Sequence, residues 1–127
     1  MSSPRILLVD DEPDLRKIIK RGLELSGCIV ESEGNPKRVL ATFRPRRYDI
    51  VILDVGMPSM DGFELYERLA EIDSQLKVCF LTAYDIEYFQ EFRERFPKVP
   101  EKCFLRKPVG IKDLLNTVKS QLGTATA

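Results

Sequence analysis

Carboxylate, hydroxyl and ammonium side chains follow four short apolar runs of the sequence, at or within two residues of their ends. These groups are Asp10, Asp11, Asp54, Thr82 and Lys107. Three carboxylates in one pocket repel one another, so such a pocket raises the pKa of at least one of them or binds a cation. Oxygen ligands suit Mg²⁺, Mn²⁺ or Ca²⁺, and a site with few carboxylates and room for water and a phosphate oxygen favours Mg²⁺. A carboxylate can also act as a nucleophile that forms an aspartyl-phosphate.

Each of these residues has an ordinary explanation when it is considered alone. Aspartates at strand ends often serve as turn or N-cap residues, which is the better interpretation of Asp10 or Asp61 in isolation. Thr82 alone fits any strand-end threonine, and Lys107 alone fits a solvated surface lysine. Their occurrence together, each after a different apolar run, is what indicates a site.

The apolar pattern predicts five strands that alternate with five helices. Short apolar runs indicate buried strands at residues 6–9, 28–30, 50–53, 78–81 and 103–105. Helical spacing follows, for example at Leu15, Ile18, Ile19 and Leu23, at Leu65, Leu69 and Ile72, and at Ile86, Phe89, Phe92 and Phe96. This alternation predicts an α/β fold: a single doubly wound (βα)5 domain with a parallel five-stranded sheet in the flavodoxin-like order 2-1-3-4-5. That order places Asp10 and Asp11 beside Asp54.

The composition predicts a single domain located in the cytoplasm. The chain has 127 residues, with 20 basic and 20 acidic ones, so its overall charge gives no attraction toward nucleic acid or membrane lipid. Histidine is absent, which excludes the usual general base and transition-metal ligand. No apolar run approaches the ~20 residues that span a bilayer. The three cysteines, Cys28, Cys79 and Cys103, are expected to be buried thiols.

Four segments resemble the response-regulator receiver domain of two-component signalling, a CheY-like family. These segments are Leu8-Val9-Asp10-Asp11-Glu12, residues 54–62, Thr82-Ala83 and Lys107-Pro108. They occur in the family's order, and the resemblance covers the chain from about Arg5 to Leu122. A receiver domain is therefore expected at residues 4–122, followed by a frayed tail or linker stub at residues 123–127.

The resemblance implies a role for each residue of the site. Asp54 would be the phosphoryl acceptor, and the phosphoryl group would be contacted by Lys107 and Thr82. The Mg²⁺ ion would be held by Asp10, Asp11, Asp54 and Gly56. The switch would consist of Thr82 and Phe104, and the loops would be shaped by Pro58, Gly62 and Pro108. Within the Mg²⁺ set, Asp11 would bind directly, Asp10 through water and Gly56 through its main-chain carbonyl.

The resemblance also implies a signalling function. A sensor histidine kinase, or a small phosphodonor, would give a phosphoryl group to Asp54. Phosphorylation would then shift a two-state conformational equilibrium, and the shift would be read at the face formed by the expected fourth helix, fifth strand and fifth helix. A downstream protein or effector domain would read that face. Phosphorylation could also lead to homodimerisation. No nucleic acid or membrane is an expected direct partner, and no separate substrate is expected to be turned over, although such a domain promotes its own phosphorylation and dephosphorylation.

Three alternatives have different sequence requirements. A receiver-like interaction module that is never phosphorylated would not need the intact set of Asp11, Asp54, Thr82 and Lys107. An aspartyl-phosphate phosphatase needs a second aspartate two residues after the first, where this chain has Gly56. A nucleotide-binding protein needs a glycine-rich phosphate loop, and none follows the first expected strand.

Residues 85–102 depart from the family pattern. The segment is longer than usual and rich in aromatic residues. We expect Phe89, Phe92 and Phe96 to pack in the core and Tyr88 to be exposed on a partner surface. A further hypothesis is that Tyr84, two residues after Thr82, screens the acyl phosphate from water.

Overall fold

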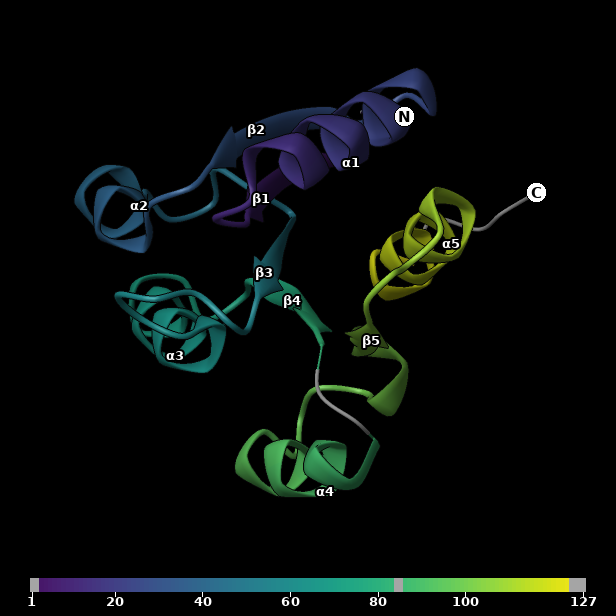
Figure 1. Ribbon diagram of the computed structural model, residues 1–127. Helices are drawn as coiled ribbons and strands as arrows, with labels where there is room; N and C mark the ends of the chain where they lie inside the picture. Colours follow the sequence, from purple (N-terminus) through teal and green to yellow (C-terminus); the bar gives the residue numbers. More distant parts are fainter. Residues whose placement is uncertain (1–2, 84–85, 124–127) are drawn as a thin grey trace.

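The structure is a computed structural model that describes residues 3–83 and 86–123, and for residues 86–89 and 92 it describes the backbone alone. Its elements are, in chain order, β1 (Arg5–Val9), α1 (Pro13–Leu25), β2 (Ile29–Glu33), α2 (Pro36–Thr42), β3 (Ile50–Asp54), α3 (Gly62–Ile72), β4 (Lys77–Thr82), α4 (Ile86–Arg95), the 3₁₀ helix η1 (Glu101–Cys103), β5 (Phe104–Arg106) and α5 (Ile111–Gln121). Figure 1 shows the strands at the centre of the molecule with the helices around them. The predicted alternation of strands and helices is confirmed.

The five strands form a parallel sheet in the order β2-β1-β3-β4-β5, which confirms the predicted order. In the register of the sheet, Val9 is opposite Leu53, and Thr82 is opposite Arg106. The carboxyl ends of β1, β3, β4 and β5 therefore reach the same edge of the sheet. The residues that follow these strands are brought together at that edge.

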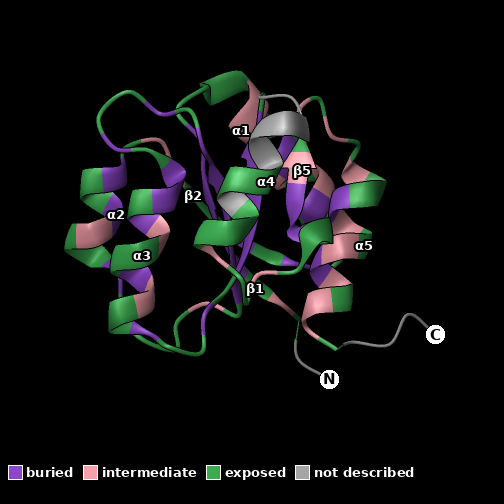
Figure 2. Ribbon diagram, turned by 90° about the horizontal axis from the view of Figure 1, so that it is seen from below, coloured by how far each residue is buried: buried purple, intermediate pink, exposed green. Residues whose placement is uncertain are grey.

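Helices cover both faces of the sheet, with α1 and α5 on one face and α2, α3 and α4 on the other (Figure 1). Alternate strand residues point to the two faces, so that Leu7 and Val9 pack with side chains of α2 and α3, whereas Ile6 and Leu8 pack with side chains of α1 and α5. Figure 2 shows the buried residues on the strands and on the inner sides of the helices. Burial on both faces explains why the strands are continuous apolar runs in the sequence.

Local sequence signals determine where the helices begin. Pro13 occupies the first position of α1, where its missing N–H has no hydrogen bond to lose. The side chain of Asn35 accepts a hydrogen bond from the N–H of Lys37 (3.0 Å) at the start of α2, and Asp61 accepts one from the N–H of Glu64 (2.8 Å) at the start of α3. The prediction that Asp61 is an N-cap is confirmed.

Some details differ from the sequence predictions. Ile18, which was placed on the apolar stripe of its helix, is 62% exposed, because adjacent Ile19 faces the sheet and consecutive helical residues point about 100° apart. Ile72 is 42% exposed at the last position of α3. Cys103, expected in the fifth strand, belongs instead to η1, and β5 begins at Phe104.

The predictions for residues 84–92 are only partly covered by the structure. The side chains of Tyr84, Tyr88, Phe89 and Phe92 lie outside the described residues. Phe96 is described, and its ring lies 5.4 Å from that of Phe63 and 5.5 Å from that of Phe80 between ring centroids, which confirms its packing against the core. The three cysteines are free thiols and buried, as predicted. In the described ranges, no helix has the length and apolarity needed to cross a membrane.

Candidate functional site

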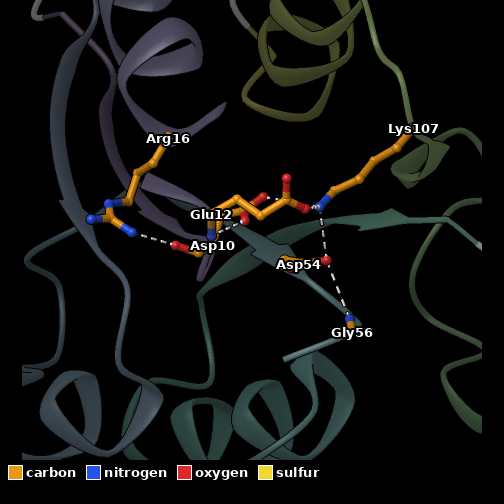
Figure 3. Close-up of polar contacts among 6 residues, drawn as sticks. All are labelled: Asp10, Glu12, Arg16, Asp54, Gly56 and Lys107. Carbon is orange, nitrogen blue, oxygen red and sulfur yellow. Dashed lines mark hydrogen bonds and ion pairs between the residues drawn. The ribbon is translucent and has the colours of Figure 1, made fainter. Parts of the chain in front are cut away.

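The side chain of Lys107 lies among carboxylates at the carboxyl edge of the sheet. Its Nζ is 3.1 Å from Asp10 Oδ2 and 3.1 Å from Asp54 Oδ1. Glu12 Oε1 is 3.5 Å from the same nitrogen. Figure 3 shows these carboxylates, from the end of β3 and the turn after β1, converging on the ammonium. The structure therefore brings three distant stretches of chain into one charged cluster, which consists of Asp10, Glu12, Asp54 and Lys107.

The backbone of β4 and β5 determines where the Lys107 side chain starts. The N–H of Lys107 donates a hydrogen bond to the carbonyl of Thr82 (2.8 Å), directly after the register pair of Thr82 and Arg106. The peptide bond between Lys107 and Pro108 is cis. The Lys107 side chain is 15% exposed. Its ammonium is therefore held largely by acidic groups instead of water.

Asp54 is the last residue of β3 and is only 4% exposed. The N–H of Gly56 donates a hydrogen bond to Asp54 Oδ1 (3.2 Å), and the N–H of Val55 donates to the carbonyl of Leu81 (2.9 Å). The turn after β3 is thus fixed to the neighbouring strand on one side and to the Asp54 carboxylate on the other. These contacts orient the Asp54 carboxylate toward Lys107.

Burial raises the pKa of Asp54 from 3.8 to about 6, and the negative charge of Asp10 adds to the rise. The Lys107 ammonium and the N–H of Gly56 oppose this rise without cancelling it. Desolvation lowers the pKa of Lys107, but Asp10 and Asp54 outweigh it, so the pKa ends above the usual value. Lys107 is therefore an ammonium at neutral pH, and it shares its charge between two buried carboxylates.

The turn formed by Asp10, Asp11 and Glu12, here called the acidic turn, is held by its own backbone and by α1. Asp10 is fully buried, and its Oδ1 accepts a hydrogen bond from the N–H of Glu12 (2.9 Å). The carbonyl of Asp10 accepts a hydrogen bond from Arg16 Nη1 (2.7 Å). Asp10 Oδ2 forms the ion pair with Lys107 but accepts no directed hydrogen bond from any described residue. It therefore has capacity for a further positive partner.

The acidic turn fits a hard divalent cation. One carboxylate oxygen from each of Asp10, Asp11 and Glu12 lies within 4.8 Å of the other two. These oxygens, together with the buried Asp10 Oδ2, are the ligand type that Mg²⁺ prefers. In the described part of the chain, Asp54 is not a member of this close group, and it is connected to Asp10 through the Lys107 ammonium.

Thr82 and Phe104, the expected switch residues, are both buried. Thr82 ends β4 and is 1% exposed. Phe104 is opposite Phe80 in the sheet register, and the two rings stack with centroids 5.3 Å apart. The Phe104 ring therefore lies in the core in this structure.

Of the loop residues of the predicted site, Gly62 is buried, and Pro58 and Pro108 are exposed. Two residues of this region, Glu12 in the cluster and Arg16 beside it, had no predicted role. Glu12 directly follows the aspartate pair, so its position in the sequence could have indicated it. Arg16 has no such signal, because its contact with the Asp10 carbonyl depends on how α1 leaves the turn.

The fold and the cluster define a class of protein: a (βα)5 domain with an acidic turn, a buried aspartate and a lysine at the carboxyl edge of its parallel sheet. The sequence model for the response regulator receiver domain matches residues 6–119. The chain belongs to this family.

Relatives and solved structures agree with this assignment. Response regulator receiver protein CpdR of Brucella abortus (strain 2308) is 32% identical over 120 residues, which cover 93% of this chain and 96% of that protein. Transcriptional regulatory protein PrrA of Mycobacterium leprae (strain TN) is 37% identical over 83 residues, which cover 65% of this chain and 36% of that protein, so the match spans about a third of that relative. The crystal structure of a CheY-like receiver domain protein from Methanospirillum hungatei JF-1 superposes with a TM-score of 0.81, at 27% identity over 96% of this chain and 95% of that one.

Receiver domains are phosphorylation switches of two-component systems and do not turn over a separate substrate in the usual sense of an enzyme. As general features of the family, they are phosphorylated on an aspartate and bind Mg²⁺ at an acidic cluster. They interact with sensor histidine kinases and with downstream effectors.

Proposed function

We propose that this domain accepts a phosphoryl group on Asp54 from a sensor histidine kinase, or from a small phosphodonor, and relays it as a conformational change. The observation that carries the proposal is the position of Lys107, whose ammonium lies 3.1 Å from both Asp10 and Asp54. An ammonium at this place can neutralise an oxygen of a phosphoryl group that arrives at Asp54. The functional unit is proposed to span residues 4–122.

The proposed transfer is a displacement at phosphorus by the Asp54 carboxylate. One Asp54 oxygen forms a bond to phosphorus while the bond from phosphorus to the donor's leaving group breaks, and the leaving group keeps the electron pair. Lys107 stabilises the negative charge on the phosphoryl oxygens. Mg²⁺, when bound, supplies further positive charge there. Its proposed holders are Asp11 directly, Asp10 through water, the Gly56 carbonyl and Asp54.

The proposed switch begins with the charge and the three acceptor oxygens that phosphorylation adds. The Thr82 hydroxyl donates a hydrogen bond to one of these oxygens, and the loop after β4 moves with it. Phe104 transmits the change to the surface of α4, β5 and α5, while Pro58, Gly62 and Pro108 maintain the loops around the site. A downstream protein or effector domain in the cytoplasm reads this surface, and homodimerisation on phosphorylation uses the same surface.

Incubation with acetyl phosphate and Mg²⁺, followed by intact-mass measurement, tests this proposal. The wild-type protein should gain the mass of one phosphoryl group, and removal of Mg²⁺ with EDTA should abolish the gain. Asp54→Asn should abolish it as well, whereas Asp49→Asn, an exposed aspartate near the start of β3, should leave it intact. A folded wild-type protein that gains no mass with acetyl phosphate or with a phosphorylated kinase would refute the proposal.

A further inference from the structure

Glu12 contacts Lys107 from the solvent side of the charged cluster. Its Oε1 is 3.5 Å from Lys107 Nζ, and its side chain is 64% exposed, compared with 0% for Asp10 and 6% for Asp54. Figure 3 shows its carboxylate beside the ammonium. Lys107 therefore has two buried partners and one partner at the mouth of the cluster.

The side chain of Glu12 is free to make this contact because it does not cap its helix. Glu12 is the N-cap residue of α1, but its side chain makes no cap hydrogen bond. Its main chain is fixed, since its N–H donates to Asp10 Oδ1 (2.9 Å) and its carbonyl accepts from the N–H of Arg16 (3.0 Å). Because its main chain is fixed and its carboxylate does not cap the helix, the Glu12 side chain can extend from a defined position to Lys107.

A divalent cation at the acidic turn would weaken the attraction between Lys107 and the Asp10 carboxylate, because the two positive charges would share its oxygens and repel each other. A phosphoryl group on Asp54 would occupy the second buried partner. Glu12 lies outside that buried pair and is not one of the proposed holders of Mg²⁺, so its attraction for the ammonium would persist. Glu12 also belongs to the acidic turn, and its charge therefore acts on a bound cation as well as on Lys107.

We propose that Glu12 is a positioning residue for Lys107, whose ammonium it keeps at the mouth of the cluster when a divalent cation and a phosphoryl group engage Asp10 and Asp54. This inference rests on the proposed function and adds a residue to its machinery. Without the Glu12 carboxylate, Lys107 pairs only with Asp10 and Asp54 in the metal-free protein. When the divalent cation and the phosphoryl group are present, its ammonium then leaves the site more readily.

The first test measures Mg²⁺ affinity of the unphosphorylated protein by calorimetry in a double-mutant cycle of Glu12→Gln and Lys107→Gln. With Lys107 present, Glu12→Gln should weaken Mg²⁺ binding by about 3- to 10-fold, since the ammonium then competes for the buried carboxylates. With Lys107→Gln, only the direct loss of charge remains, and the effect should be about 2-fold or less. Equal effects in the two backgrounds would show that Glu12 acts as a nearby charge alone, and would overturn the inference.

The second test separates contact from charge with Glu12→Asp. This variant keeps the charge but is one methylene shorter, and aspartate is also drawn to cap the helix. Its rate of phosphorylation by acetyl phosphate at saturating Mg²⁺ should fall by about 3- to 10-fold, as for Glu12→Gln. Asp14→Asn, which removes an exposed charge from the first turn of α1, should keep the wild-type rate. A wild-type rate for Glu12→Asp would overturn the inference.

The two tests also distinguish failure of this inference from failure of the proposed function. A wild-type protein that is never phosphorylated would refute the proposed function, whereas the Mg²⁺ cycle would still report the contact between Glu12 and Lys107. Normal phosphorylation with no coupling in the cycle would refute the inference alone.

Discussion

Gly62 lies directly against the backbone of Asp54, so that a Cβ atom at position 62 would come within 2.5 Å of the Asp54 carbonyl oxygen. Gly62 is the first residue of α3, and its N–H donates a hydrogen bond to the carbonyl of Val55 (3.1 Å). The start of the helix therefore packs on the segment that holds the buried carboxylate. These neighbours are backbone atoms, which cannot rotate aside as a side chain would.

Gly62→Ala is predicted to lower the free energy of unfolding by about 1–3 kcal/mol, because the added methyl group forces α3 away from the turn after β3. This loss should occur even though alanine favours a helix over glycine by about 1 kcal/mol. Urea unfolding measures the change. Gly56→Ala is the matched control, since a Cβ there meets nothing within 4 Å. Similar unfolding free energies for the two variants would contradict this explanation.

Asp54→Asn is predicted to stabilise the metal-free domain at neutral pH. The pKa of Asp54 is raised from 3.8 to about 6, so the folded state binds this proton more tightly than the unfolded chain does. The stability that proton binding to Asp54 provides is then fully present below about pH 4 and is lost as the pH rises through about 6, where the buried carboxylate becomes charged. Asparagine removes this dependence and should raise the free energy of unfolding at pH 7.5 by about 1–3 kcal/mol.

Urea unfolding in EDTA at pH 4.5 and pH 7.5 measures this difference. The advantage of Asp54→Asn over wild type should shrink markedly at the lower pH. Glu91→Gln, which neutralises an exposed carboxylate of α4, is the control and should change the free energy of unfolding only slightly. A constant advantage for Asp54→Asn at both values would argue against the raised pKa as its cause.

The fold could be predicted because the sequence repeats one strong physical pattern. A strand buried on both faces requires a continuous apolar run, as at residues 50–53 of β3, and such runs are distinct from helical stripes. The width of a helical stripe is harder to predict, because Ile18 and Ile19 are equally apolar and only Ile19 faces the sheet. The helix orientation that decides between them depends on packing against the whole sheet.

The candidate site could be predicted as far as residue types at strand ends allow. Asp10, Asp54 and Lys107 meet because parallel strands end at one edge, which is a consequence of topology. The contacts of Glu12 and Arg16 depend on side-chain directions and on how the chain turns after β1. The place of Glu12 after the aspartate pair puts it near the site, but no spacing rule gives the direction of its side chain toward Lys107.

Asp73→Ala is predicted to lower the free energy of unfolding by about 2–4 kcal/mol, because two backbone N–H groups lose a buried acceptor. Asp73 is 5% exposed and accepts hydrogen bonds from the N–H groups of Arg46 and Gln75, both at 3.0 Å. The bond to Arg46 holds a residue whose φ of 65° is unfavourable for most side chains. Urea unfolding should show a smaller loss, about 1 kcal/mol or less, for Asp49→Ala, because the hydrogen bond that its carboxylate accepts from the N–H of Arg5 is exposed. Equal losses would mean that burial does not explain the contribution of Asp73 to the free energy of unfolding.

Gly34→Ala is predicted to act through Arg16. A Cβ at position 34 would lie 2.5 Å from Arg16 Nη1, the same atom that donates to the carbonyl of Asp10. The guanidinium is flexible and can move, but it then loses this hydrogen bond, which should cost about 1 kcal/mol of unfolding free energy. In an Arg16→Ala background nothing remains to be displaced, so Gly34→Ala should be neutral or stabilising by a few tenths of a kcal/mol. Urea unfolding of the four proteins of this cycle gives the coupling. If Gly34→Ala lowered the free energy of unfolding equally with and without Arg16, the backbone conformation at position 34 would be what requires glycine. The acidic turn would then not depend on the space that Gly34 leaves for Arg16.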